Sequence, residues 1–199
     1  MIAPFKFTKC LAASAALLAL SAHAELQVWR MTGMVYDELT SQGGAYVPPS
    51  SAYAHGKTVN VDYVVDTAVT APDGGSTYSA IRTFTVNGIG SYAEGTIWAD
   101  GVGLNALNVG PTRPRSDQVS FLSFNRFNGP KATSVSHALA DFSTATAAGV
   151  DVDYRIDFGS AGSVRIRPTS FTQQTLPARC KFPLFRLIDP QCEALRLIK

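Results

Sequence analysis

The feature that most constrains this chain is a series of short segments in which apolar and polar side chains alternate. The clearest segment, 58–69, places four apolar side chains on one face: Val59, Val61, Tyr63 and Val65. Successive side chains of a β-strand point to opposite faces, so one face can pack on a core while the other meets water. The alternation therefore predicts sheet structure.

Eight segments are predicted as strands from this pattern and from their content of Val, Thr, Ile, Phe and Tyr: 26–37, 58–69, 78–86, 90–99, 118–127, 133–142, 150–158 and 163–172. Turn residues separate them, and Asn87-Gly88 predicts a two-residue hairpin. Regular short strands indicate an antiparallel sandwich or barrel. We expect an all-β fold, a single antiparallel β-sandwich that is jelly-roll-like or Greek key, over residues 25–174.

One of these segments is open to a second interpretation. Residues 132–148 are rich in alanine, which favours a helix. However, Val135, His137 and Leu139, with Asp141, do not follow a helical stripe, and a strand is favoured.

Residues 1–24 carry the three parts of a secretory signal peptide. Lys6 and Lys9 supply a positive start, an uncharged run rich in Leu and Ala follows, and an Ala-His-Ala triplet ends at Ala24. We expect cleavage that leaves Glu25 first and exports the protein to the periplasm or the medium. The alternative is an uncleaved anchor, but the apolar run is shorter than the ~20 residues of a membrane-spanning helix. No permanent membrane anchor is therefore expected.

Removal of the signal peptide changes the charge balance. The whole chain has 17 Lys+Arg and 15 Asp+Glu, and loss of Lys6 and Lys9 leaves 15 of each. A nucleic-acid-binding protein would show a basic stripe with aromatic residues between, and the body of this chain shows none. Nucleic acid is therefore not an expected partner.

The cysteines indicate a distinct C-terminal segment. Cys10 leaves with the signal peptide, so Cys180 and Cys192 remain. In an oxidising compartment the simplest interpretation is one disulfide, with two free thiols as the alternative. Residues 175–199 are punctuated by proline and carry an apolar cluster. We expect them to form a short disulfide-linked appendage.

No residue pattern marks a catalytic site. His55 and His137 are the only histidines after residue 24, and neither has an acidic or cysteine neighbour at ligand spacing. No nucleophile-elbow motif accompanies them. We expect no catalytic residue, no cofactor and no metal ligand, and a non-enzymatic protein is favoured over an enzyme.

Two sets of carboxylates share a strand face: Asp151, Asp153 and Asp157 in one segment, and Asp62 and Asp66 in another. Calcium takes six to eight oxygen ligands, yet alternate carboxylates of a strand project ~6–7 Å apart and do not converge. Arg155 stands among the first set, as is typical of a solvated, charge-balanced face. That interpretation is favoured, and calcium stays as an alternative.

Four aromatic residues are candidates for stacking on sugars: Trp29, Trp98, Tyr46 and Tyr53. In a β-sandwich such residues more often pack in the core or at an edge, and we favour this interpretation.

A set of strand and turn motifs follows in order along the chain: Thr32-Gly-Met-Val35, then Gly56-Lys-Thr-Val-Asn-Val-Asp-Tyr-Val-Val-Asp-Thr67, Tyr78, Phe84-Thr-Val-Asn-Gly88 and Asp117-Gln-Val-Ser-Phe121. This succession resembles the β-rich ectodomains of bacterial PEP-CTERM exoproteins over about residues 28–172. The resemblance implies an exported β-sandwich, often linked to extracellular polysaccharide or biofilm matrix, and supplies no catalytic residues. The Pro-Glu-Pro, apolar helix and Arg cluster of the family's sorting tail are missing from residues 176–199. We therefore expect a soluble protein after export, with a replaced or altered gene end as the alternative.

Three functions are consistent with these observations. The favoured one is non-enzymatic binding of a cell-surface protein or an extracellular polysaccharide. The alternatives are a secreted carbohydrate-binding or carbohydrate-active protein, and a calcium-stabilised adhesion domain.

Overall fold

A computed structural model of the chain describes residues 26–39, 50–71, 77–87, 89–98, 103–108, 119–159, 162–177 and 180. The predicted signal peptide with its Ala24–Glu25 cleavage site lies outside the described residues, as does Cys192 with most of the predicted appendage. In the described part of the chain, no helix is long and apolar enough to cross a membrane.

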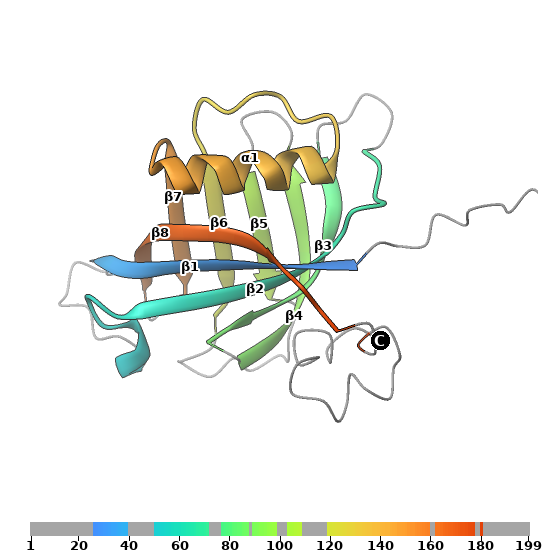
Figure 1. The fold of residues 1–199 in the computed structure, drawn as a ribbon. Helices are drawn as coiled ribbons and strands as arrows, with labels where there is room; N and C mark the ends of the chain where they lie inside the picture. The colour runs from blue at the N-terminus through green and yellow to red at the C-terminus, as the bar shows by residue number, and fades with distance from the viewer. Residues whose placement is uncertain are drawn as a thin grey trace, which may run out of the picture.

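The described strands form one antiparallel sheet that closes into a barrel (Figure 1). The elements are β1 (Leu26–Leu39), the 3-10 turn η1 (Ser51–Tyr53), β2 (Thr58–Asp66), β3 (Thr77–Val86), β4 (Ile89–Trp98), β5 (Gly103–Asn108), β6 (Phe121–Arg126), α1 (Val135–Ala148), β7 (Val152–Asp157) and β8 (Ser163–Gln174). Each strand pairs with the next one along the chain, and β8 returns to pair with β1. The predicted all-β class is confirmed.

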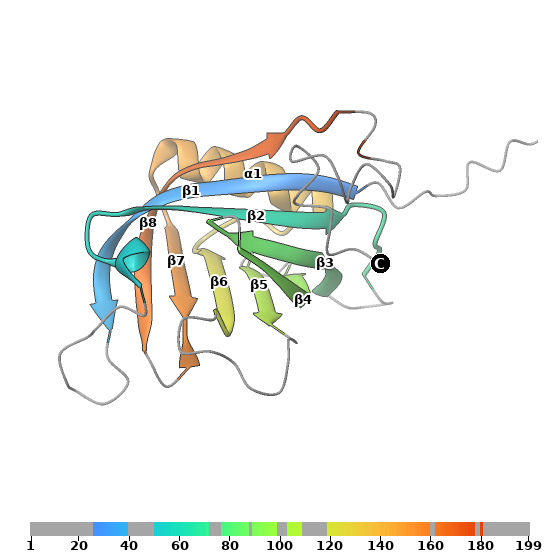
Figure 2. The same cartoon turned by 90° about the horizontal axis from the view of Figure 1, so that it is seen from below.

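In its described part, the structure has a single closed sheet and not the two packed sheets of the predicted β-sandwich. Jelly rolls and Greek keys pair strands that are distant in sequence, whereas among the strands that the structure describes only β1 and β8 do so. Viewed from below, the strands curl continuously from β2 round to β8 (Figure 2). Alternation cannot separate the two architectures, because both bury one face of every strand.

The closure depends on irregularities in the two longest strands. β1 has 14 residues and β8 has 12, and their register shifts between Thr32 and Gly33 and again between Val35 and Asp37. Such bulges bend a strand and increase its twist. A Cβ atom on Gly33 would lie 2.5 Å from Cγ2 of Ile166 and 2.6 Å from the carbonyl oxygen of Arg167. Glycine therefore permits the close approach of β8 at this bend.

The prediction of a strand over residues 133–142 is wrong, because α1 occupies this segment (Figure 1). Ser134 caps the helix by accepting a hydrogen bond from the His137 N–H at 3.1 Å. Gly149 ends the helix in the left-handed conformation, with φ 66°. The buried side chains recur three and four residues apart: Val135, Ala138, Leu139, Phe142, Ala145 and Thr146. A search at two-residue spacing misses this face.

Two connections show where local signals decide the structure. The predicted hairpin is confirmed: Val86 pairs with Ile89, and Asn87 adopts φ 49°. In contrast, β5 is missing from the predicted strands. Its sequence, Gly-Leu-Asn-Ala-Leu-Asn, has no β-branched or aromatic residue, and it is held by pairing with β4 on one side and β6 on the other.

Aromatic side chains fill the interior of the barrel. The Phe124 ring lies 4.5 Å from Phe142, 5.2 Å from Tyr154 and 5.4 Å from Phe171, measured between centroids. Phe142 comes from α1, so the helix contributes to the same core as the strands. Trp29 stacks on Phe171 at 5.2 Å and extends this cluster.

The chain beyond β8 covers part of the outer side of the barrel. Val28 and Val64 are partners in register on β1 and β2, and they are only 2% and 1% exposed. Cys180 packs on this pair, together with Leu26 and Leu176. Cys180 is disulfide-bonded, and its predicted pairing with Cys192 falls outside the described residues.

Candidate functional site

Of the three carboxylates predicted to share a strand face, Asp157 of β7 and Asp151, which precedes β7 with φ 53°, are engaged by protein groups. Asp157 accepts hydrogen bonds from the Ser120 hydroxyl at 3.1 Å, from the Gly159 N–H at 2.7 Å and from Arg155 at 3.1 Å. Asp151 lies 3.2 Å from Nη1 of Arg126. These contacts agree with the predicted charge-balanced face. Among the described residues, no three His, Cys, Asp or Glu side chains gather as a metal site would require.

The carboxylates on β2 are also paired with arginines. Arg30 binds Asp62 through two parallel bonds, Nε to Oδ1 at 2.7 Å and Nη2 to Oδ2 at 2.8 Å. This hydrogen bonding raises the pKa of the Arg30 guanidinium, while partial burial acts in the opposite direction. Asp66 binds Arg82 at 2.7 Å and accepts from the Ala68 N–H at 3.1 Å. Both carboxylates therefore act as ion-pair partners.

The histidines and the aromatic candidates have local structural contacts. The His137 ring Nδ1 accepts from the Thr133 N–H at 3.3 Å, beside the start of α1. Tyr53 is 4% exposed and packs on Phe158 at 4.7 Å between centroids. For Trp29 and Tyr53 the favoured core interpretation is confirmed. Tyr46 and the side chain of Trp98 lie outside the described residues.

Two tyrosine hydroxyls meet inside the barrel. Tyr63 of β2 and Tyr154 of β7 are both fully buried, and their hydroxyl groups hydrogen-bond to each other. Burial raises the pKa of Tyr63, and the bond from Tyr154 offsets this in part. Burial likewise raises the pKa of Tyr154. Both phenols are therefore neutral at physiological pH, and neither can serve there as a base. The sequence offers no signal for this pair, because 91 residues separate its members.

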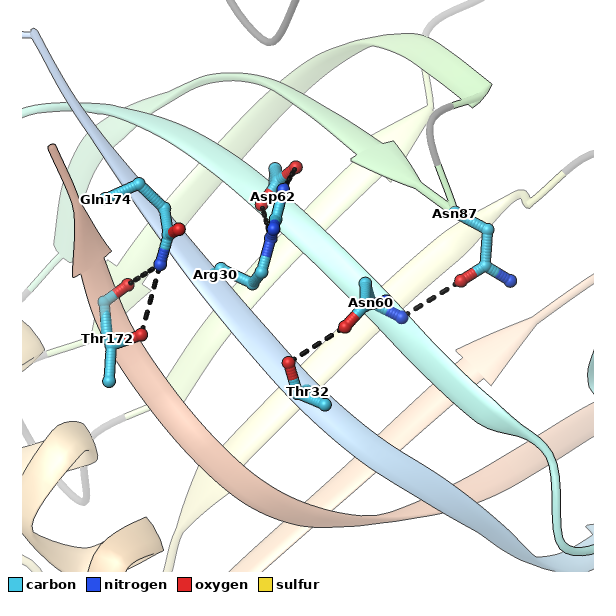
Figure 3. Close-up of polar contacts among 7 residues, drawn as sticks. All are labelled: Arg30, Thr32, Asn60, Asp62, Asn87, Thr172 and Gln174. Carbon is cyan, nitrogen blue, oxygen red and sulfur yellow. Dashed lines mark hydrogen bonds and ion pairs between the residues drawn. The ribbon is translucent and has the colours of Figure 1, made fainter. Parts of the chain in front are cut away.

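Polar side chains gather on the outer side of β8, β1 and β2. Because Trp29, Met31, Val61 and Tyr63 point inward, their neighbours point outward. We call this surface the outer polar face and define it by the seven residues that Figure 3 shows: Arg30, Thr32, Asn60, Asp62, Asn87, Thr172 and Gln174.

The register of the strands sets these side chains in rows. Arg30 stands opposite Asp62 on one side and opposite Thr172 on the other. Thr32, two residues along β1, stands opposite Asn60. The Arg30 side chain is 44% exposed, so a partner can reach this row from solvent.

Hydrogen bonds within the outer polar face hold the side chains in place (Figure 3). The Thr32 hydroxyl bonds to Oδ1 of Asn60 at 2.8 Å, and the Asn60 N–H donates to Oδ1 of Asn87 at 3.0 Å. Gln174 donates through Nε2 to both oxygens of Thr172, at 3.2 Å and 3.1 Å. A partner would meet groups that are already ordered, which lowers the entropic cost of binding.

Arg30, Thr32, Asn60 and Asp62 alternate with inward apolar residues of the predicted strands. Thr172 is an even number of residues from the inward Val164 and Ile166, so strict alternation would place it inward, and the register shift near Gly33 brings it to the outer side beside Arg30. The sequence alone could therefore not predict this part of the face. Comparison of the chain with protein-family models, with curated proteins and with solved structures finds no match.

Proposed function

We propose that this chain is an exported, non-enzymatic binding protein that contacts an extracellular polysaccharide or a cell-surface protein through the outer polar face. The observation that carries the proposal is the ordered, hydrogen-bonded array of side chains on the outside of β8, β1 and β2.

The packing of the interior supports an outer surface as the place of binding. A closed barrel of about eight strands is just wide enough for side chains to fill it or for one small ligand to enter. Here large side chains occupy the interior, and Phe142 of α1 adds to them. Among the strand residues that the structure describes, the side chains that remain available to a partner are those on the outer side.

The chemistry of the outer polar face supports a hydroxyl-rich or amide-rich partner. It presents amides from Asn60 and Gln174, hydroxyls from Thr32 and Thr172, and the guanidinium of Arg30 beside a carboxylate. Sugar hydroxyls and peptide groups both donate and accept hydrogen bonds, and this array offers donors and acceptors to match.

Export is part of the proposal. The predicted signal peptide supports it, and so does the disulfide at Cys180, because disulfides persist in oxidising compartments. We propose Cys192 as the partner of Cys180, with the segment 175–199 as a disulfide-linked appendage; within it, Leu176 and Cys180 pack against Val28 and Val64 on the outer side of β1 and β2.

Binding of the labelled full chain to an array of glycans and of purified surface proteins tests this function. We expect at least one ligand, and we expect the double variant Asn60→Ala, Thr172→Ala to bind it about tenfold less tightly, since each lost hydrogen bond costs ~0.5–1.5 kcal/mol. Ser79→Ala, an exposed position on β3, is the matched control and should bind like the parent. Ligand binding that the double variant leaves unchanged would place the interface elsewhere and refute the proposal.

A further inference from the structure

We infer that the partner is an acidic polysaccharide whose carboxylates bind three arginines on the outer side of β7 and β8: Arg155, Arg165 and Arg167. We call these residues the arginine patch. The inference rests on the proposed function and names the chemical class of the partner.

The strand register brings the three arginines together. Arg155 of β7 stands directly opposite Arg165 of β8. Arg167 lies two residues further along β8, so its side chain leaves the same face about 6–7 Å away. The residues between them, such as Ile156 and Ile166, are fully buried, which means that the arginines point outward. The side chains of Arg155 and Arg165 are 46% and 44% exposed.

The arginine patch adjoins the outer polar face through β1. Arg167 pairs in register with Met34, which follows Thr32 on the outward side of β1. Met34 is 40% exposed, and the Arg167 guanidinium lies 5.2 Å from the centre of the Tyr36 ring. A chain-like ligand can therefore run from the rows around Thr32 to the arginine patch without leaving the outer side of β1 and β8.

Among the described residues, Arg165 and Arg167 donate no side-chain hydrogen bond and Arg155 and Arg82 donate one each, whereas Arg30 and Arg126 donate more. Arg30 uses two nitrogens on one carboxylate. Arg126 bonds to Asp141, to Asp151 and to the Phe127 carbonyl oxygen, and its side chain is only 13% exposed.

By contrast, Arg165 approaches its carboxylate partner, Asp37, only to 3.8 Å, beyond hydrogen-bond distance. Arg155 makes one bond, to Asp157 at 3.1 Å. The Arg167 guanidinium lies over the ring of Tyr36. Each guanidinium has five N–H donors, and a planar carboxylate accepts two of them in parallel.

The placement of like charges also favours an anion. Two cations directly opposite on neighbouring strands destabilise a sheet, and Arg155 and Arg165 are such a pair. Asp157, 3.1 Å from Arg155, and Asp37, 3.8 Å from Arg165, offset this repulsion in part, and a ligand carboxylate between the two guanidinium groups would offset it further. The face also carries Asp37, Asp153 and Asp157, so its net charge is near zero. It therefore offers little long-range attraction to a polyanion, and a ligand would be held by direct bonds between guanidinium and carboxylate groups.

Tyr36 and Met34 explain why a sugar polymer fits better than a simple anion. An apolar ring and a thioether beside ionic groups offer a surface to the apolar faces of sugar rings. The hydroxyl and amide groups of the outer polar face then meet the sugar hydroxyls. A polymer of uronic acids presents all three kinds of group in one chain.

The test is the affinity of the full chain for polygalacturonate, with dextran as the neutral control polymer. We expect binding to polygalacturonate and not to dextran, and a loss of about tenfold or more in affinity for each of Arg165→Ala and Arg167→Ala, because each removes charge-assisted hydrogen bonds to a carboxylate. Arg82→Ala removes a guanidinium of similar exposure, 43%, from β3 and should bind like the parent. Circular dichroism verifies that each variant is folded.

Four outcomes overturn the inference. If duplex DNA or anionic lipid vesicles bind as tightly as polygalacturonate, the patch recognises negative charge and not a sugar carboxylate. If the arginine variants bind polygalacturonate like the parent, the patch is not the site. If polygalacturonate does not bind while a neutral glycan or a surface protein does, and Asn60→Ala with Thr172→Ala weakens that binding, the inference fails and the proposed function stands. If no ligand of any class binds, both fail.

Discussion

The buried hydroxyl pair of Tyr63 and Tyr154 makes a prediction that depends on the fold alone. Each hydroxyl has the other as its hydrogen-bond partner inside an aromatic core. Replacing one tyrosine with phenylalanine removes the bond and strands the remaining hydroxyl away from water. Such a stranded group costs ~1–3 kcal/mol, whereas removal of both partners is nearly neutral. We therefore expect Tyr63→Phe and Tyr154→Phe each to destabilise the protein by ~1–3 kcal/mol, and the double variant to lie close to the parent.

The same pair sets the response of stability to alkaline pH. A tyrosine titrates near pH 10.0 in the unfolded chain, and burial raises the folded-state pKa of both phenols above that value. The unfolded chain therefore loses its protons first. The contribution of the pair to stability is fully present below pH 10 and falls as the pH rises beyond it, by ~1.4 kcal/mol per phenol at pH 11 and about 3 kcal/mol for both.

Urea unfolding followed by circular dichroism at pH 7 and pH 11 measures both effects, without reductant so that the disulfide persists. The parent should lose about 3 kcal/mol more than the double variant between the two pH values. Tyr36→Phe, on the outer side of β1, serves as a control for the loss of a phenol outside the pair. The reasoning is refuted if the two single costs simply add in the double variant. It is also refuted if parent and double variant lose stability equally at pH 11.

Two further substitutions test how α1 is attached to the barrel. Phe142→Ala should lower the free energy of unfolding, measured in urea at pH 7, by ~3–5 kcal/mol, because the ring packs between Phe124 at 4.5 Å and Phe171 at 6.0 Å. A loss below ~1 kcal/mol would show that the helix does not share the barrel core. Arg126→Ala should lower the free energy of unfolding by ~2–3 kcal/mol, because it leaves Asp141, which is 14% exposed, without its ion-pair partner. If Arg126→Lys has the same stability as the parent, a multidentate guanidinium is not needed at this position.

The strands could be predicted from the sequence because their signal is local. Alternation over a few residues identifies the inward set of β2, and Asn87-Gly88 marks the turn between β3 and β4. The closure could not be predicted in this way. It depends on the pairing of β8 with β1, which brings the two ends of the described fold together, and on a close approach at Gly33. No local pattern records either of these contacts.

The error over α1 has a specific physical origin. Ser134 and Gly149 are ordinary start and stop residues of a helix, and they frame the segment. The apolar face is made partly of alanines, Ala138 and Ala145, whose small side chains give a weak hydrophobic signal. Only Leu139 and Phe142 are large. Val135, His137 and Leu139, taken two residues apart, resemble a strand, whereas the capping residues Ser134 and Gly149 indicate a helix.

On the outer side of β1 and β2, one apolar row is buried, whereas the neighbouring polar row keeps its arginine exposed. Where that side is apolar, at Val28 and Val64, the segment after β8 folds back and buries it under Leu176 and Cys180. One row further along, the partners are Arg30 and Asp62, and the arginine stays 44% exposed. Apolar surface requires cover in water, but a paired guanidinium does not. Leu176 and Cys180 therefore account for the burial of the apolar row, whereas Arg30 in the next row stays open to a partner of matching polarity.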